Sequence, residues 1–80
     1  MAKYDDAVAE CDRALAKAYG VPKASLYMTK GRLLEKKKDP EAAKKAYEDG
    51  IAFGRTLPED TGKSVVAALE KALAAVGKTP

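Results

Sequence analysis

The stretch Lys36–Ile51, KKKDPEAAKKAYEDGI, combines a helix start with a dense group of lysines. Asp39, Pro40 and Glu41 form a strong start signal, because an N-cap carboxylate precedes a proline at the first helical position and an acid in the first turn. We expect this helix to run from Pro40 to about Gly54, with one face made of Ala43, Ala46, Tyr47, Gly50 and Ile51. Asp39 is then the shortest possible connection to a preceding helix, and so short a link forces an antiparallel hairpin.

The whole chain predicts one small all-α domain covering residues 1–80. Sixteen of the 80 residues are alanine, and Lys, Glu, Arg and Leu, which are also good helix formers, fill much of the remainder. A chain of this length buries only about 60–65% of its unfolded surface. With a single cysteine and no histidine, it can form no internal disulfide and lacks the commonest metal ligand and general base.

Apolar periodicity predicts three further helices. The first is expected over about Tyr4 to Tyr19, the second from Pro22 or Lys23 to Lys37, and the fourth from between Pro58 and Lys63 to Gly77. We expect Gly20 and Pro22 to end the first helix. The expected inward faces are Tyr4, Ala7, Val8, Cys11, Ala14, Leu15 and Ala18; Leu26, Tyr27, Gly31, Leu33 and Leu34; and Val65, Val66, Leu69, Ala72, Leu73 and Val76.

An internal repeat relates the first and third of these helices. A shift of 36 residues places Ala7 on Ala43, Cys11 on Tyr47 and Leu15 on Ile51, so that small residues match small ones and apolar residues match each other. Repeats of this period are typical of stacked helical units that share one core.

Within residues 4–58 the sequence resembles the tetratricopeptide repeat (TPR) family. The residues that carry the resemblance are Tyr27, Gly31 and Leu34 in the first helix of a repeat and Ala43, Tyr47, Gly50 and Ile51 in the second. The resemblance implies four antiparallel helices in a helical-hairpin array, consisting of a half repeat, a full repeat and a capping helix. Because this layout has half repeats at both ends, it favours an excised, assembled or designed chain.

The resemblance also implies a surface for peptides. Similar repeats bind extended peptides on a concave side lined by their first helices, which here would present Ser25, Met28, Thr29, Arg32 and Lys36. Family members that capture acidic chaperone tails use a clamp of Lys, Asn and Arg. Thr29 and Arg32 stand at the asparagine positions, so that clamp is not expected.

The lysine cluster admits a second interpretation, as a nucleic-acid site. Residues 30–45 hold seven Lys or Arg and three Asp or Glu, a local charge of +4 in a chain of net charge +3. Nucleic-acid binding favours aromatic groups between the charges, whereas Tyr27 and Tyr47 belong to the expected core. Lys44 and Lys45 fall opposite that core, so we interpret the cluster as a solvated face and argue against nucleic acid.

The other chemical signals are weak. Thr61-Gly62-Lys63-Ser64 ends like a phosphate-binding loop, but that motif requires glycine at position 57, which is leucine, and a preceding strand. Cys11 lies on the apolar face and is expected to be a small buried hydrophobe. Acidic neighbours such as Glu48 and Asp49 point in different directions on a helix, so no catalytic, cofactor or metal site is expected.

We therefore expect a non-enzymatic TPR-like scaffold, engineered or designed, with no evolved ligand. The alternative is a natural TPR fragment that binds an extended peptide on its concave face. We expect either no partner or a peptide or protein, rather than nucleic acid or a membrane. The longest apolar run, Val65–Leu69, is too short to cross a membrane and the start lacks a signal segment, which predicts a cytoplasmic, reducing setting.

For assembly, two arrangements of the fourth helix stay open. It either caps the third helix of its own chain or supplies the missing half repeat to the first helix of another copy. Its alanines at 67, 68, 74 and 75 widen the apolar arc but expose little area. We expect a monomer at micromolar concentration, with weak head-to-tail association above it.

Overall fold

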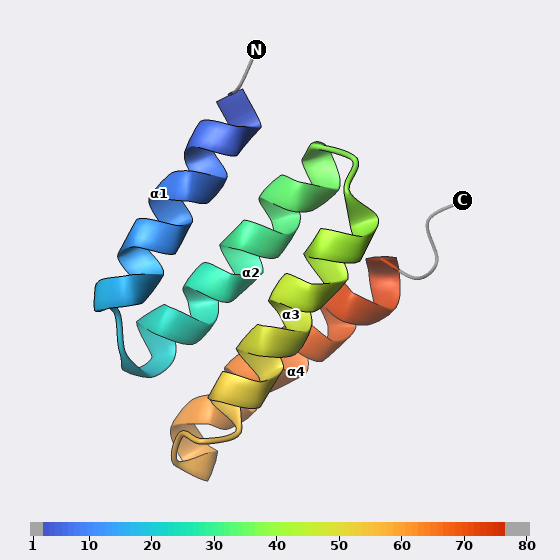
Figure 1. Ribbon diagram of the computed structural model, residues 1–80. Helices are drawn as coiled ribbons and strands as arrows, with labels where there is room; N and C mark the ends of the chain where they lie inside the picture. The colour runs from blue at the N-terminus through green and yellow to red at the C-terminus, as the bar shows by residue number, and fades with distance from the viewer. Residues whose placement is uncertain (1–2, 77–80) are drawn as a thin grey trace.

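The computed structural model of the protein describes residues 3–76 as four α-helices (Figure 1). They are α1 (Lys3–Lys17), α2 (Gly20–Lys36), α3 (Pro40–Gly54) and α4 (Glu59–Val76). The first three lie side by side and alternate in direction, and α4 crosses behind α3 (Figure 1). Residues 3–76 contain no strand. The prediction of an all-α chain with four helices is therefore confirmed.

The turn between α2 and α3 follows from the helix signals at its two ends. The Asp39 side chain accepts a hydrogen bond from the Ala42 amide at 3.3 Å, as expected of an N-cap, and Pro40 opens α3. At the end of α2 the Asp39 amide donates to the Leu34 carbonyl at 2.9 Å. This return bond requires a left-handed residue, and Lys38 takes that role with φ of 69°.

The turn between α1 and α2 differs from the prediction. Helix α1 ends at Lys17 rather than near Tyr19, and α2 begins at Gly20 rather than at Pro22 or Lys23. Gly20 has φ of 68°, a conformation open to glycine at no steric cost, and it reverses the chain. Pro22 then lies within the first turn of α2, where a missing N–H removes no helical hydrogen bond.

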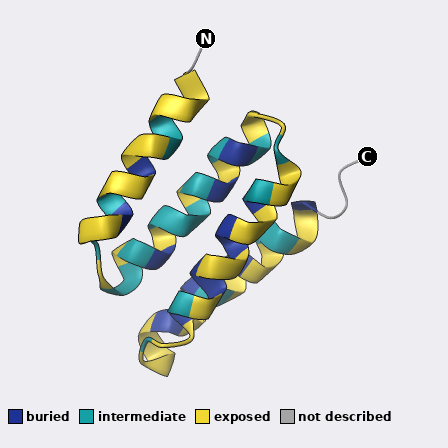
Figure 2. Ribbon diagram, in the orientation of Figure 1, coloured by how far each residue is buried: buried dark blue, intermediate teal, exposed yellow. Residues whose placement is uncertain are grey.

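Helix α3 lies at the centre of the core because it packs on both α2 and α4. All five residues predicted for its inward face are buried, and Tyr47 and Ala43 have no exposed surface. Gly50 makes the double contact possible, since a Cβ there would lie 2.7 Å from Tyr27 Cβ on α2 and 3.0 Å from Leu69 Cδ1 on α4. Figure 2 shows the buried segments concentrated where these helices face each other.

The predicted inner face of α2 is partly wrong. Gly31 and Leu34 are buried, but Leu26, Tyr27 and Leu33 are only half-buried, whereas Ala24, which was not predicted, is fully buried. Leu26 and Leu33 have a common reason. Both leucines share a helical face with Lys30, whose ammonium pairs with Asp12 of α1 at 2.6 Å. They therefore face the thin α1 side of the molecule, and Ala24 faces the main core.

Helix α1 is the outermost element and packs on α2 alone among the described helices. Cys11 and Leu15 are buried there, but Tyr4 in the first turn is 41% exposed, contrary to its expected inward position. At the other edge α4 packs on α3 and also reaches α2. This is the local capping arrangement, and it leaves the outward sides of α1 and α4 as the two edges of the molecule (Figure 1).

Candidate functional site

Among the described glycines, Gly31 of α2 has the closest neighbour, the Tyr47 ring of α3. A Cβ at Gly31 would lie 2.6 Å from Tyr47 Cζ and closer still to Cε1, so the ring occupies the space that a side chain would need. The Tyr47 hydroxyl donates a hydrogen bond to the Glu35 carboxylate, one turn further along α2. The ring is thus buried among apolar groups and its polar end is satisfied.

The pKa values of two groups are shifted by burial at helix contacts, Tyr47 between α2 and α3 and Cys11 between α1 and α2. Burial, reinforced by the hydrogen bond to Glu35 and its negative charge, raises the pKa of Tyr47 above its ordinary value of 10.0. Burial is also the main reason that the pKa of Cys11 is raised, with the neighbouring Asp12 carboxylate second. A thiol that stays protonated is a poor nucleophile, so Cys11 behaves as a packing group, and Tyr47 does so because its ring is fully buried.

The predicted peptide-facing residues divide into two classes. Ser25, Thr29, Arg32 and Lys36 are exposed along one side of α2, and the Thr29 hydroxyl donates to the Ser25 carbonyl at 3.3 Å. Met28 is half-buried and packs against the core cluster. We call the four exposed residues the α2 strip. These four residues lie along one side of α2, whereas Met28 packs against the core.

The lysines around the central turn are exposed, and two of them form ion pairs. Lys37 pairs with Asp5 of α1, an interaction that raises the pKa of Lys37, and Lys45 lies 3.7 Å from Asp49 one turn away. Lys44 is exposed opposite the buried face of α3. The cluster thus lies outside the core, as a solvated face would.

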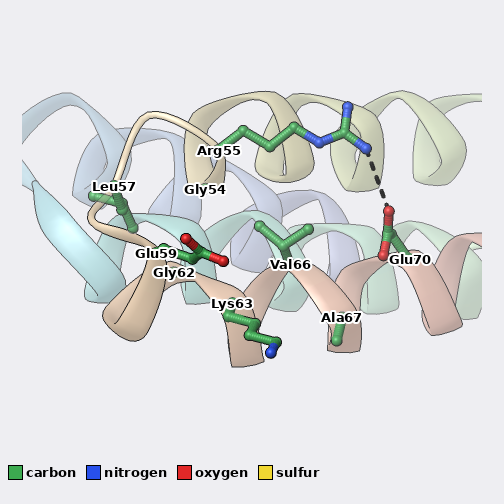
Figure 3. Close-up of a pocket in the computed structure, with 9 residues that line it drawn as sticks. All are labelled: Gly54, Arg55, Leu57, Glu59, Gly62, Lys63, Val66, Ala67 and Glu70. Carbon is green, nitrogen blue, oxygen red and sulfur yellow. Dashed lines mark hydrogen bonds and ion pairs between the residues drawn. The ribbon is translucent and has the colours of Figure 1, made fainter.

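A groove between α3 and α4 is a feature that the sequence did not predict (Figure 3). It is lined by Gly54, Arg55, Leu57, Glu59, Gly62, Lys63, Val66, Ala67 and Glu70 and has a volume of about 410 Å³. Arg55 extends from the end of α3 toward Glu70 of α4, and their side chains pair at 3.3 Å (Figure 3). The sequence shows the small residues Gly54 and Gly62, but they lie next to each other only because of the way α4 crosses α3.

The segment that resembles the end of a phosphate-binding loop lies in the first turns of α4. Gly62 is buried there, and a Cβ at this position would lie 2.6 Å from the Gly54 carbonyl oxygen. The glycine therefore permits the close crossing of α3 and α4. Lys63 and Ser64 follow it as exposed helical residues.

Neither a metal cluster nor a membrane span is found within residues 3–76. No three His, Cys, Asp or Glu side chains gather there in a way that could hold a metal ion. None of the described helices combines the length and the apolar character needed to cross a bilayer.

The comparison with known proteins covers the whole chain. Searches against protein families, curated proteins and solved structures find no match to it.

Proposed function

We propose that the chain is a non-enzymatic, TPR-like helical scaffold, engineered or designed and without an evolved ligand. The observation that carries the proposal is the fit of Tyr47 into the space at Gly31. The residues that make the sequence resemble a TPR repeat are the same residues that hold α2 against α3.

The polar chemistry of the described chain supports this interpretation. Within residues 3–76, every buried side-chain nitrogen or oxygen has a hydrogen-bond partner. Tyr47 and Cys11, whose pKa values are raised above their ordinary values, both lie at helix contacts. Their position fits a protein whose chemistry stabilises packing, since reactive groups lie in accessible clefts.

A titration followed by two-dimensional NMR tests the proposal. Labelled protein is mixed with ATP, with single-stranded DNA and with an extended acidic peptide, at physiological salt. We expect no saturable shift of backbone resonances with any of them. Saturable shifts with ATP that are lost in Lys63→Ala would contradict the non-enzymatic proposal.

A second candidate function is binding of an extended acidic peptide along the α2 strip. Arg32 and Lys36 favour it, because both are exposed on one side of α2 and take part in none of the ion pairs formed within the described residues. The peptide titration decides the matter. Saturable shifts along α2 that vanish in Arg32→Ala/Lys36→Ala, but persist in Lys44→Ala/Lys45→Ala on α3, would favour this function over the scaffold.

A further inference from the structure

The described chain consists of two related hairpins, α1–α2 and α3–α4. The 36-residue shift places α1 on α3 and also places α2 on α4. In both units the first helix packs on the second, and the two units are joined chiefly by the contact of α2 with α3. A surface of α4 therefore corresponds to the α3-binding surface of α2.

The corresponding residues of α4 are exposed. The shift carries Lys23, Tyr27, Gly31, Leu34 and Glu35 of α2 onto Glu59, Lys63, Ala67, Glu70 and Lys71 of α4. We call these five α4 residues the α4 face. Four of them line the groove of Figure 3, so the groove runs along the surface that a further helix would cover.

We propose that the occupant of the α4 face is helix α1 of a second copy of the chain. Helix α1 is the counterpart of α3, and it packs on α2 alone, so the side that would meet a preceding helix lies at the edge of the molecule. The contact between copies, α4 with α1, would repeat the contact between α2 and α3 within one copy.

Side-chain size supports this pairing. In the internal contact a tyrosine, Tyr47, fills the space left by a glycine, Gly31. Their counterparts are Cys11 on α1, which is already buried within its own copy, and Ala67 on α4, and both are small. Ala7 and Ala14, the counterparts of Ala43 and Gly50, are half-buried and also small. A helix pair with small residues on both sides can approach closely without a large side chain from either.

In the same register, charge explains why the contact is weak. Lys23 lies 5.0 Å from the centre of the Phe53 ring, and the counterparts of these residues are Glu59 and Lys17, an attractive pair. Phe53 also lies 6.5 Å from the Tyr27 ring, and the counterpart of Tyr27 is Lys63, which would repel Lys17. Alanine-rich surfaces bury little apolar area, so this interface forms above micromolar concentration.

Such a contact joins different surfaces of the two copies. In a pair of copies, the α4 face of one and the outer side of α1 of the other therefore stay free. Heterologous contacts of this kind form rings or open chains rather than closed two-fold dimers. We expect the weight-average mass to rise continuously with concentration rather than to stop at a dimer.

Sedimentation of the full chain across micromolar to millimolar concentrations, with Cys11 kept reduced, tests the proposal. Ala67→Arg places a long charged side chain on the α4 face and should weaken association about tenfold or more. The matched control is Ala68→Arg, an exposed neighbour that lies off this face and should associate like the parent. Lys63→Glu removes the repulsion of Lys17 and should strengthen association, and adding Lys17→Glu should reverse that gain.

Alanine and arginine have similar helix propensities, so circular dichroism should show equal folding for Ala67→Arg and Ala68→Arg. Equal effects of Ala67→Arg and Ala68→Arg would overturn the proposal. So would a concentration-independent dimer, or a monomer at millimolar concentration, which would leave the α4 face to a different protein.

Discussion

The contribution of a single residue to stability depends on how far it is buried and on its hydrogen-bond partners, as Tyr47 shows. Tyr47 is fully buried, yet its hydroxyl donates to Glu35. Replacing it with phenylalanine keeps the ring and removes the hydrogen bond. Because the acceptor is charged, we expect Tyr47→Phe to lower the free energy of unfolding by about 1.5 kcal/mol at neutral pH. Urea denaturation measures this, and Tyr19→Phe, at an 83% exposed tyrosine, should leave stability unchanged.

The same tyrosine predicts a response to alkaline pH. The pKa of Tyr47 is raised above 10.0 in the folded chain, so the stability it contributes is fully present below pH 10.0 and is lost as the pH rises beyond it. The stability difference between parent and Tyr47→Phe should therefore shrink above this pH, by up to about 1.4 kcal/mol per pH unit. Urea denaturation at successive pH values measures it, and a constant difference would show that Tyr47 titrates normally.

Lys38 is held in a conformation that suits glycine. Its φ of 69° is left-handed and costs a residue with a side chain about 1–2 kcal/mol. We expect Lys38→Gly to raise the free energy of unfolding by about 1 kcal/mol, after allowance for the greater freedom of glycine in the unfolded chain. Lys45→Gly, within α3, should instead lower it by about 1 kcal/mol. Thermal unfolding of both variants compares them, and destabilisation by Lys38→Gly would contradict the turn geometry.

At the scale of elements, the face of α3 was easier to predict than those of the other three helices. Every inward residue predicted for α3 is buried, because this helix is covered on two sides and its apolar stripe faces both neighbours. Leu33 and Tyr4 are less buried than predicted. Periodicity shows which residues of a helix are apolar, but it does not show how much of the neighbouring helix covers them. The groove at Gly54 and Gly62 depends on how two helices cross, which periodicity does not contain.

The close approach of α2 and α3 can be tested at Ala43. This residue has no exposed surface, and a larger side chain there has no space. Ala43→Leu should lower the free energy of unfolding by about 1–3 kcal/mol. Lys44→Leu, at the exposed neighbouring position, should change it by less than about 0.5 kcal/mol. Urea denaturation compares the two, and a neutral Ala43→Leu would show that the repeat register is wrong.

At the scale of the whole molecule, stability should be uneven. The Cα atoms span 39 × 30 × 13 Å, so the fold is a thin slab with its core between α2, α3 and α4. Helix α1 packs on α2 alone. We expect its amides to exchange with solvent faster than those of α2 and α3, because local opening of an edge helix exposes little of the core. Hydrogen exchange measured by NMR tests this, and uniform protection of all four helices would contradict it.

The central claim is that this fold is held together by a tyrosine seated on a glycine, and equilibrium unfolding of Gly31→Ala tests it most directly. Helix propensity alone predicts that alanine stabilises α2 by about 1 kcal/mol. The Tyr47 ring occupies the space that the new methyl group needs, so we predict a loss of about 2 kcal/mol or more. Thr29→Ala, an exposed substitution in the same helix, is the matched control and should be neutral or slightly stabilising. If Gly31→Ala instead raised the free energy of unfolding by about 1 kcal/mol, as helix propensity alone predicts, the claim would be contradicted.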